Sequence, residues 1–156
     1  MANARDDLLT AALAVFDRDG FEGATVAAIR ERAGASNGSF FHFFNSKREL
    51  AGTLFLEILR RYHIAMLDKI DPPPGAEEGI ACLIRTHLAW VVDNRREANF
   101  LFEISRSEWA QDVREGRMAR NATVAEGVEA WRAPLVASGD LLPMKASLFL
   151  SQIIGP

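Results

Sequence analysis

Cysteine is almost absent from this sequence of 156 residues, in which Cys82 is the single example. A lone cysteine cannot form a disulfide within the chain, so the fold has to be held together by a hydrophobic core in a reducing compartment. The sequence also shows no secretion signal, and no apolar run reaches the roughly 18–20 residues that cross a bilayer. We therefore expect a cytoplasmic protein that does not contact a membrane.

Strand signals and enzyme motifs are scarce as well. The sequence has no sustained alternation of apolar and polar residues, and no metalloprotease, phosphate-loop or dinucleotide-binding pattern. Its histidines, His42, His63 and His87, do not have the spacing of metal ligands. We therefore predict an all-α protein that is not an enzyme and has no metal, cofactor or catalytic residues. A metal or covalent adduct beside His87 would favour the enzyme alternative.

The charge balance excludes a generally basic nucleic-acid coat protein, because the formal net charge is −3. DNA affinity depends, however, on the charges that face the phosphates and not on the total. Between Arg30 and Arg48 the balance is positive, with Arg30, Arg32, Lys47 and Arg48 against Glu31. This segment is therefore a candidate contact surface for DNA.

Helical periodicity runs through the whole chain. The spacing of apolar residues predicts helices over about 4–18, 26–33, 37–43, 47–68, 77–93, 96–107 and 111–137, and a last helix from near Pro143. Gly20 is expected to end the first helix, and Asp71–Gly75, which contains three prolines, to form a stiff linker. The last helix is apolar up to Pro156, so we expect a further helix after this position.

The first third of the chain has the pattern of a helix-turn-helix. Thr25, Ser36 and Ser46 are each suited to cap the N-terminus of a helix, and Glu49 completes a capping box with Ser46. Gly34 closes the first of two short helices, and the second of them is the one that enters the major groove in helix-turn-helix proteins. We predict a DNA-binding domain over 1–48 and a helical domain over 49–156.

The spacing within this segment resembles that of the TetR (tetracycline-repressor-like) family. The matched residues, in chain order, are Ala11, Ala12, Leu13, Phe16, Gly20, Phe21, Thr25, Ala33, Gly34, Ala35, Ser36, Gly38, Phe40, Phe44, Ser46, Lys47 and Leu50. The resemblance implies a three-helix DNA-binding head packed on a C-terminal helical bundle. It also implies a transcriptional regulator, as a rule a repressor, that works as a homodimer on palindromic half-sites and responds to a small-molecule inducer.

The same resemblance implies which residues contact DNA. Thr25 and Lys47 are expected at phosphates, and the short or planar polar side chains of the second helix at base edges. The full set expected at DNA is Thr25, Ser36, Asn37, Gly38, Ser39, Phe41, His42, Lys47 and Arg48. Two positions depart from the family pattern, because Phe41 replaces its tyrosine and Phe43 its histidine or tyrosine. Loss of one hydroxyl contact to phosphate is expected to weaken binding by about 1 kcal/mol.

The C-terminal domain offers apolar residues for a ligand pocket. The residues expected to line it are Phe55, Leu59, Tyr62, Met66, His87, Phe102 and Trp131, which would suit an apolar or aromatic molecule. For each of them ordinary core packing is the alternative. His87, on the apolar stripe of its helix, is either a polar anchor for the ligand or a core histidine with its own hydrogen-bond partner.

Two further alternatives stay open. The chain can be a helical protein-interaction module with a degenerate DNA-binding head, an interpretation that rests on Phe41 and Phe43. Cys82 can be a redox sensor, although a lone cysteine on an apolar helix is more typical of inert packing.

Overall fold

The structure is a computed structural model that describes residues 4–154, and every regular element within that range is helical. The prediction of an all-α protein is therefore confirmed. The further helix expected after Pro156 lies outside the described residues. Among residues 4–154, no helix combines the length and the apolar character that a membrane crossing requires.

The chain forms two compact units, each built from two separate stretches. The first contains Met1–Ile58 and Arg95–Arg114, and the second contains Leu59–Asn94 and Glu115–Pro156. The predicted functional boundary after residue 48 stays a prediction, since the structural division follows packing and not DNA contact.

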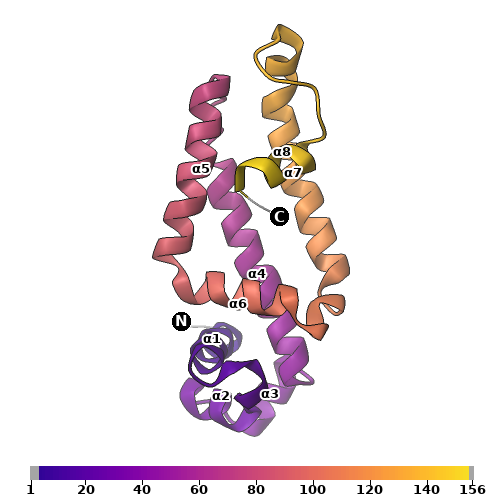
Figure 1. Cartoon of the computed structure of the whole chain (residues 1–156). Helices are drawn as coiled ribbons and strands as arrows, with labels where there is room; N and C mark the ends of the chain where they lie inside the picture. The colour runs from indigo at the N-terminus through magenta and orange to yellow at the C-terminus, as the bar shows by residue number, and fades with distance from the viewer. Residues whose placement is uncertain (1–3, 155–156) are drawn as a thin grey trace. The chain divides into compact units, whose positions relative to one another are not determined.

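The first unit contains a helix-turn-helix, formed by α2 and α3 beside α1 (Figure 1). Its elements are α1 (Ala4–Gly23), α2 (Val26–Ala33), α3 (Asn37–Phe43), the first half of α4 (Lys47–Leu67), α6 (Arg95–Arg106) and the 3-10 helix η1 (Glu108–Gln111). Helix α1 packs against α2, α3 and α6. Ile29, Phe40 and Phe44 are buried in this core, and Ala28 and Ala33 of α2 are half-buried.

Gly20 interrupts α1, as the sequence predicts, but the chain then continues in helical turns to Gly23. Its φ of +69° lies in the left-handed region, which a residue without Cβ adopts at little cost. After this break Phe21 is buried in the core, where its ring centroid lies 5.2 Å from that of Phe16 and 4.0 Å from that of Trp109 of η1. The Phe16 ring in turn stacks on Phe100 of α6, with centroids 5.4 Å apart.

The second unit contains the rest of α4 together with α5 (Ala76–Asp93), α7 (Arg114–Ser138) and α8 (Ala146–Ile154). Helix α8 packs on α5. The core includes Met66, Leu83, Val128, Trp131 and Phe149, all at most 5% exposed.

A glycine allows the closest approach in this core. A Cβ at Gly79 would lie 2.1 Å from the Trp131 ring, so α5 can pack against that ring only without a side chain at this position. The indole nitrogen of Trp131 donates to the Pro74 carbonyl at 2.9 Å, which fixes the ring.

Two predicted helix starts were wrong. The chain does not enter α7 at residue 111, because Ser107 caps the short η1 helix first, and α7 begins at Arg114. The last helix does not begin near Pro143 but at Ala146. The buried Arg132 side chain donates to the backbone carbonyls of Leu142 and Met144. These contacts keep the residues around Pro143 out of α8.

Candidate functional site

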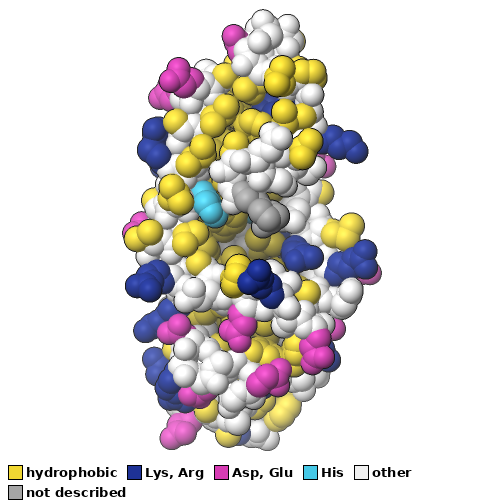
Figure 2. All heavy atoms as spheres, in the orientation of Figure 1, with side chains coloured by type: hydrophobic (Ala, Val, Ile, Leu, Met, Phe, Trp, Pro, Cys, Tyr) yellow, Lys and Arg dark blue, Asp and Glu magenta, His cyan; other side chains and the backbone are white. Residues whose placement is uncertain are grey.

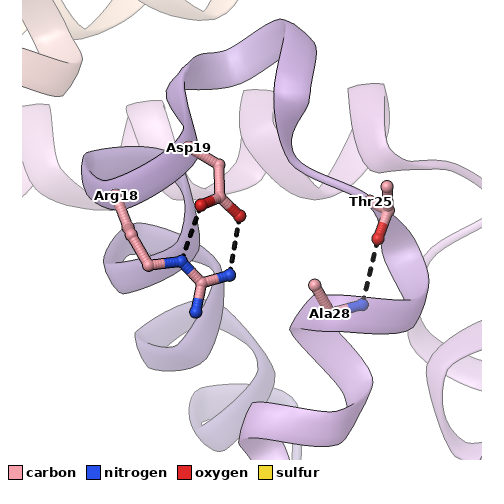
Figure 3. A network of polar contacts seen from close by, with 4 residues as sticks. All are labelled: Arg18, Asp19, Thr25 and Ala28. Atoms are coloured by element: carbon pink, nitrogen blue, oxygen red, sulfur yellow. Dashed lines mark hydrogen bonds and ion pairs between the residues drawn. The ribbon is translucent and has the colours of Figure 1, made fainter.

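The N-caps predicted at Thr25, Ser36 and Ser46 are confirmed. Thr25 accepts a hydrogen bond from Ala28 N at 3.1 Å, which Figure 3 shows at the start of α2. Ser36 accepts from Ser39 N at 3.0 Å and so begins α3, and Ser46 accepts from Glu49 N at 3.0 Å. Gly34 joins α2 to α3 with a left-handed φ of +63°. These local contacts fix the direction in which α3 leaves the turn.

One half of the predicted capping box takes another partner. The Glu49 carboxylate does not return to the Ser46 backbone but accepts from both the backbone N and the side-chain amide of Asn45, at 2.9 and 2.8 Å. The cap is therefore formed by Asn45, Ser46 and Glu49.

Helix α3 presents most of its predicted DNA-facing residues to solvent. Asn37, Gly38, Phe41 and His42 are exposed, and Ser39 is half-buried. Phe40, on the opposite side of the helix, is fully buried. The exposed face therefore carries an amide, an imidazole and an open stretch of backbone at Gly38, groups that can hydrogen-bond to base edges or phosphates.

Asn37 is not a free side chain on this face. Its Oδ1 atom accepts a hydrogen bond from Nη1 of Arg30, on α2, at 3.0 Å. The sequence placed both residues in the candidate segment but gave no reason to pair them, because the contact depends on the angle between α2 and α3.

Lys47 has an intramolecular role that sequence reasoning missed. Its ammonium group donates to the backbone carbonyls of Phe21 at 2.7 Å, Ala24 at 2.8 Å and Glu22 at 3.4 Å, and it lies 4.6 Å from the Phe21 ring centroid. These carbonyls lie at the C-terminal end of α1, where a positive charge is favoured. A cation at the start of α4 therefore has a structural reason that does not involve DNA.

Arg48 is also engaged within the first unit. It forms an ion pair with Asp112, and its guanidinium lies 4.0 Å from the Trp109 ring centroid. Both partners come from the segment around η1. The predicted phosphate contacts of Lys47 and Arg48 stay predictions, but both side chains already have protein partners.

Figure 3 also shows a forked pair at the end of α1, between Arg18 and Asp19. Nε and Nη2 of Arg18 donate to the two carboxylate oxygens at 2.6 and 2.7 Å. These hydrogen bonds raise the pKa of Arg18 and lower the pKa of Asp19. The pair is open to solvent, and exposed pairs of this kind contribute little to stability.

The predicted ligand residues fall into two groups. Tyr62 and His87 are brought together in the second unit, with the Tyr62 hydroxyl 2.9 Å from Nδ1 of His87, and the Trp90 ring lies 4.9 Å from the Tyr62 ring. Burial raises the pKa of Tyr62 to about 12 and lowers the pKa of His87. Met66 and Trp131 are buried in the core of this same unit.

The remaining three residues do not join that group. Leu59 is nearly buried in the second unit. Phe55 is buried in the first unit, and Phe102, which also belongs to it, is 60% exposed with the Arg106 guanidinium 4.4 Å from its ring centroid. The ligand set as a whole stays a prediction, of which the Tyr62–His87 pair is the part that forms a polar contact.

Sequence reasoning overlooked one short motif. Gly34–Gly38 has the pattern G-x-S-x-G, which in α/β-hydrolases presents a nucleophilic serine on a turn between a strand and a helix. Here the turn joins two helices, and Ser36 Oγ caps α3. Within residues 4–154 no group of histidine, cysteine and acidic side chains has the arrangement of a metal site.

The family model for "Bacterial regulatory proteins, tetR family" matches residues 8–54, the segment that contains α1, α2, α3 and the start of α4. A protein from Shewanella sp. PV-4 described as a tetR family transcription regulator is 25% identical and superimposes with a TM-score of 0.77, over 97% of this chain and 79% of the other. Residues 8–54 are therefore similar in sequence to the tetR family, and the chain shares its fold with a tetR family regulator.

Curated relatives match about half of this chain. The transcriptional repressor AcnR of Corynebacterium diphtheriae is 34% identical over 85 residues, which are 54% of this chain and 40% of AcnR. The transcriptional regulator BetI of Vibrio vulnificus is 39% identical over 70 residues, which are 45% of this chain and 35% of BetI. The matches thus span about two fifths or less of the curated relatives.

Proposed function

We propose that this chain is a member of the tetR family and a sequence-specific DNA-binding transcriptional regulator of the repressor type that acts in the cytoplasm. The observation that carries the proposal is α3, a helix capped at its N-terminus by Ser36 and held by the buried Phe40, with Asn37 and His42 on its open face. A short, rigidly anchored helix with polar side chains on its open face suits the major groove.

The experiment is a titration of the full chain with duplex DNA from upstream of its own gene, and with a random duplex of equal length, at two salt concentrations. We expect tighter binding to the upstream DNA and a fall in affinity with salt, because phosphate contacts release counterions. His42→Ala should reduce the preference between the two duplexes, whereas Arg32→Ala, which removes an exposed cation of α2, should weaken both alike. Equal affinity for both duplexes, without a salt dependence, would contradict the proposal.

The second unit is the proposed site of an apolar or aromatic inducer. The Tyr62–His87 pair supplies a polar anchor beside apolar side chains, which is the usual composition of a small-molecule site. The FadR regulator of Bacillus subtilis, which was solved with stearoyl-CoA, has the same fold at a TM-score of 0.76 and 19% identity. Acyl-CoA and free fatty acids are therefore the first probes to test by a thermal shift, with Tyr62→Phe expected to reduce the shift.

Homodimerisation is proposed for the second unit, since palindromic half-sites require a two-fold symmetric protein. Figure 2 shows hydrophobic side chains gathered over the helices of this unit. The large hydrophobic residues exposed in this unit include Ile64, Leu88, Val92, Met118, Leu142 and Leu148. Sedimentation of the full chain should give the mass of a dimer.

A protein-interaction module is the second candidate. It is favoured by the internal engagement of Lys47 and Arg48 and by Phe41, an aromatic residue 50% exposed on α3. The superantigen PfiT shares the fold at a TM-score of 0.76 and 23% identity, so the fold by itself does not require DNA binding. The same titration separates the regulator from the protein-interaction module, because a module of this kind would bind upstream DNA no better than random DNA.

A further inference from the structure

The contact between Arg30 and Asn37 fixes which end of the Asn37 amide is available. The guanidinium of Arg30 carries only donors, so the atom of Asn37 that lies 3.0 Å from Nη1 is its carbonyl oxygen. The two ends of an amide are otherwise hard to distinguish, and a donor-only neighbour settles the orientation. The Nδ2 amino group is therefore the end of Asn37 directed away from Arg30.

Arg30 is the more enclosed member of the pair. Its side chain is half-buried on α2, and its Nε atom is shielded from solvent without a hydrogen-bond partner in the described chain. Asn37 is exposed as the first residue of α3, next to the cap formed by Ser36. The exposed amide is therefore the member of the pair that can reach a ligand, and the half-buried cation lies behind it.

We propose that Arg30 orients Asn37 to read a DNA base as a hydrogen-bond donor, so that this position selects guanine over adenine. The proposal rests on the proposed DNA-binding function and adds the chemistry of one base contact. An asparagine that recognises adenine uses both ends of its amide, accepting from N6 and donating to N7. Arg30 takes one of the two lone pairs of the Asn37 carbonyl oxygen and places its positive charge beside the other, so the amino group is the end of the amide that stays open.

Guanine is the base whose major-groove edge fits this pair. It presents two acceptors there, N7 and O6, whereas adenine presents one acceptor and one N–H donor. The Asn37 amino group can donate to either acceptor of guanine. The positive charge of Arg30 favours the electron-rich guanine edge and disfavours the amino group of adenine.

The test is selection of duplexes from a randomised pool by the wild-type chain and by four variants, with equilibrium affinities for the selected duplexes. The wild type should select guanine at one position of each half-site. Asn37→Ala should abolish the preference at that position alone. Arg30→Ala should shift the same position toward adenine, with a change of about tenfold in the ratio of affinities for guanine and adenine, because the Asn37 carbonyl oxygen then has no cationic neighbour and can accept from adenine N6.

Two further variants guard against an effect on folding. Asn37→Asp leaves α2 intact, keeps an acceptor for Arg30 and removes the donor, so it should lose guanine and favour cytosine, whose N4 amino group donates. Arg30→Lys keeps a cationic donor and should keep the guanine preference. A wild-type preference for adenine at the position that depends on Asn37, or a guanine preference unchanged in Arg30→Ala, would overturn the inference. Absence of any sequence preference in the wild type would instead overturn the proposed function, and this inference with it.

Discussion

The ammonium nitrogen of Lys47 lies 2.7 Å from the backbone carbonyl oxygen of Phe21, two residues that are 26 positions apart in the chain. With two neighbouring carbonyls, this contact ties the end of α1 to the start of α4. A lysine ammonium has three donors, and three carbonyls are placed to receive them. Lys47 therefore holds the two helices that flank the helix-turn-helix, whatever further contact it makes with DNA.

Replacing Lys47 with methionine tests this role. Lys47→Met keeps an unbranched side chain but leaves the carbonyls at the end of α1 without their donor. We expect the free energy of unfolding in urea to fall by about 2 kcal/mol, the range for hydrogen bonds to a charged group. Arg32→Met, which removes an exposed cation of the same unit, should change it by less than about 0.5 kcal/mol.

A role of Lys47 confined to phosphate contact gives the opposite pattern. Lys47→Met would then lower the salt slope of DNA binding by about one unit and leave the unfolding free energy unchanged. Measuring both quantities on the same variant separates the two roles.

The sequence predicted the helix-turn-helix well because its determinants are local. Thr25 and Ser36 cap amides three residues further on, and Gly34 takes the left-handed conformation that few other residues adopt. Such contacts depend only on residue type and spacing. Exposure of Asn37 and His42 followed from the same periodicity, which buries Phe40 on the other side of α3 and so fixes the exposed face.

The contacts between distant segments were beyond the reach of the sequence. The ion pair of Arg48 with Asp112 joins residues 64 positions apart, and it depends on where α6 and η1 return to the first unit. Pro143 suggested a helix start because proline suits a first turn, but the buried Arg132 holds the carbonyls on either side of it. A tertiary contact outweighed the local preference there.

Alanine at Gly79 is expected to destabilise the second unit. The new Cβ would lie 2.1 Å from the Trp131 ring, which is large, buried and fixed by its hydrogen bond to Pro74. Overpacking of this kind costs about 1–3 kcal/mol, more than the roughly 0.5–1 kcal/mol that alanine gains over glycine within a helix. Urea unfolding followed by tryptophan fluorescence measures the loss.

Gly127→Ala is the matched comparison, since it also introduces a methyl group within a helix of the second unit. The nearest atom to its Cβ is a terminal methyl of Leu67, at 2.6 Å, and a flexible leucine can move where the Trp131 ring cannot. We expect Gly127→Ala to cost at least about 1 kcal/mol less than Gly79→Ala. Equal costs would show that the Trp131 ring yields as easily as the leucine.

Arg132 should prove essential to the connection between α7 and α8. It is fully buried, donates to Leu142 O and Met144 O, pairs with Glu129 at 2.7 Å and lies against the Phe149 ring. Arg132→Met leaves these carbonyls unpaired and should cost about 3 kcal/mol, with faster amide exchange in α8. Glu129→Gln, which changes the half-exposed partner of Arg132, should cost less than about 1 kcal/mol. If amide exchange in α8 stayed slow in Arg132→Met, Arg132 would not be what holds the connection between α7 and α8.

The stability of the second unit should fall as the pH falls from about 6.5 to about 4, because of His63. Burial, assisted by the positive charge of Arg120, lowers the pKa of His63 from 6.5 to about 4. Between these values the unfolded chain binds a proton at His63 that the folded chain does not, so acid favours unfolding. Above pH 6.5 the contribution is fully present, and below pH 4 no more is lost. The slope for one such group is at most about 1.4 kcal/mol per pH unit.

Substitution isolates the part of this slope that belongs to His63. Burial also lowers the pKa of His87, which therefore adds a loss of the same sign, and carboxylates contribute at the acid end. Comparing wild type with His63→Gln at pH 7 and pH 5 removes these shared contributions, since the variant keeps them all. The variant should lose less stability between the two pH values than the wild type. If His63→Gln and wild type lost the same amount, His63 would be free to take up its proton in the folded protein.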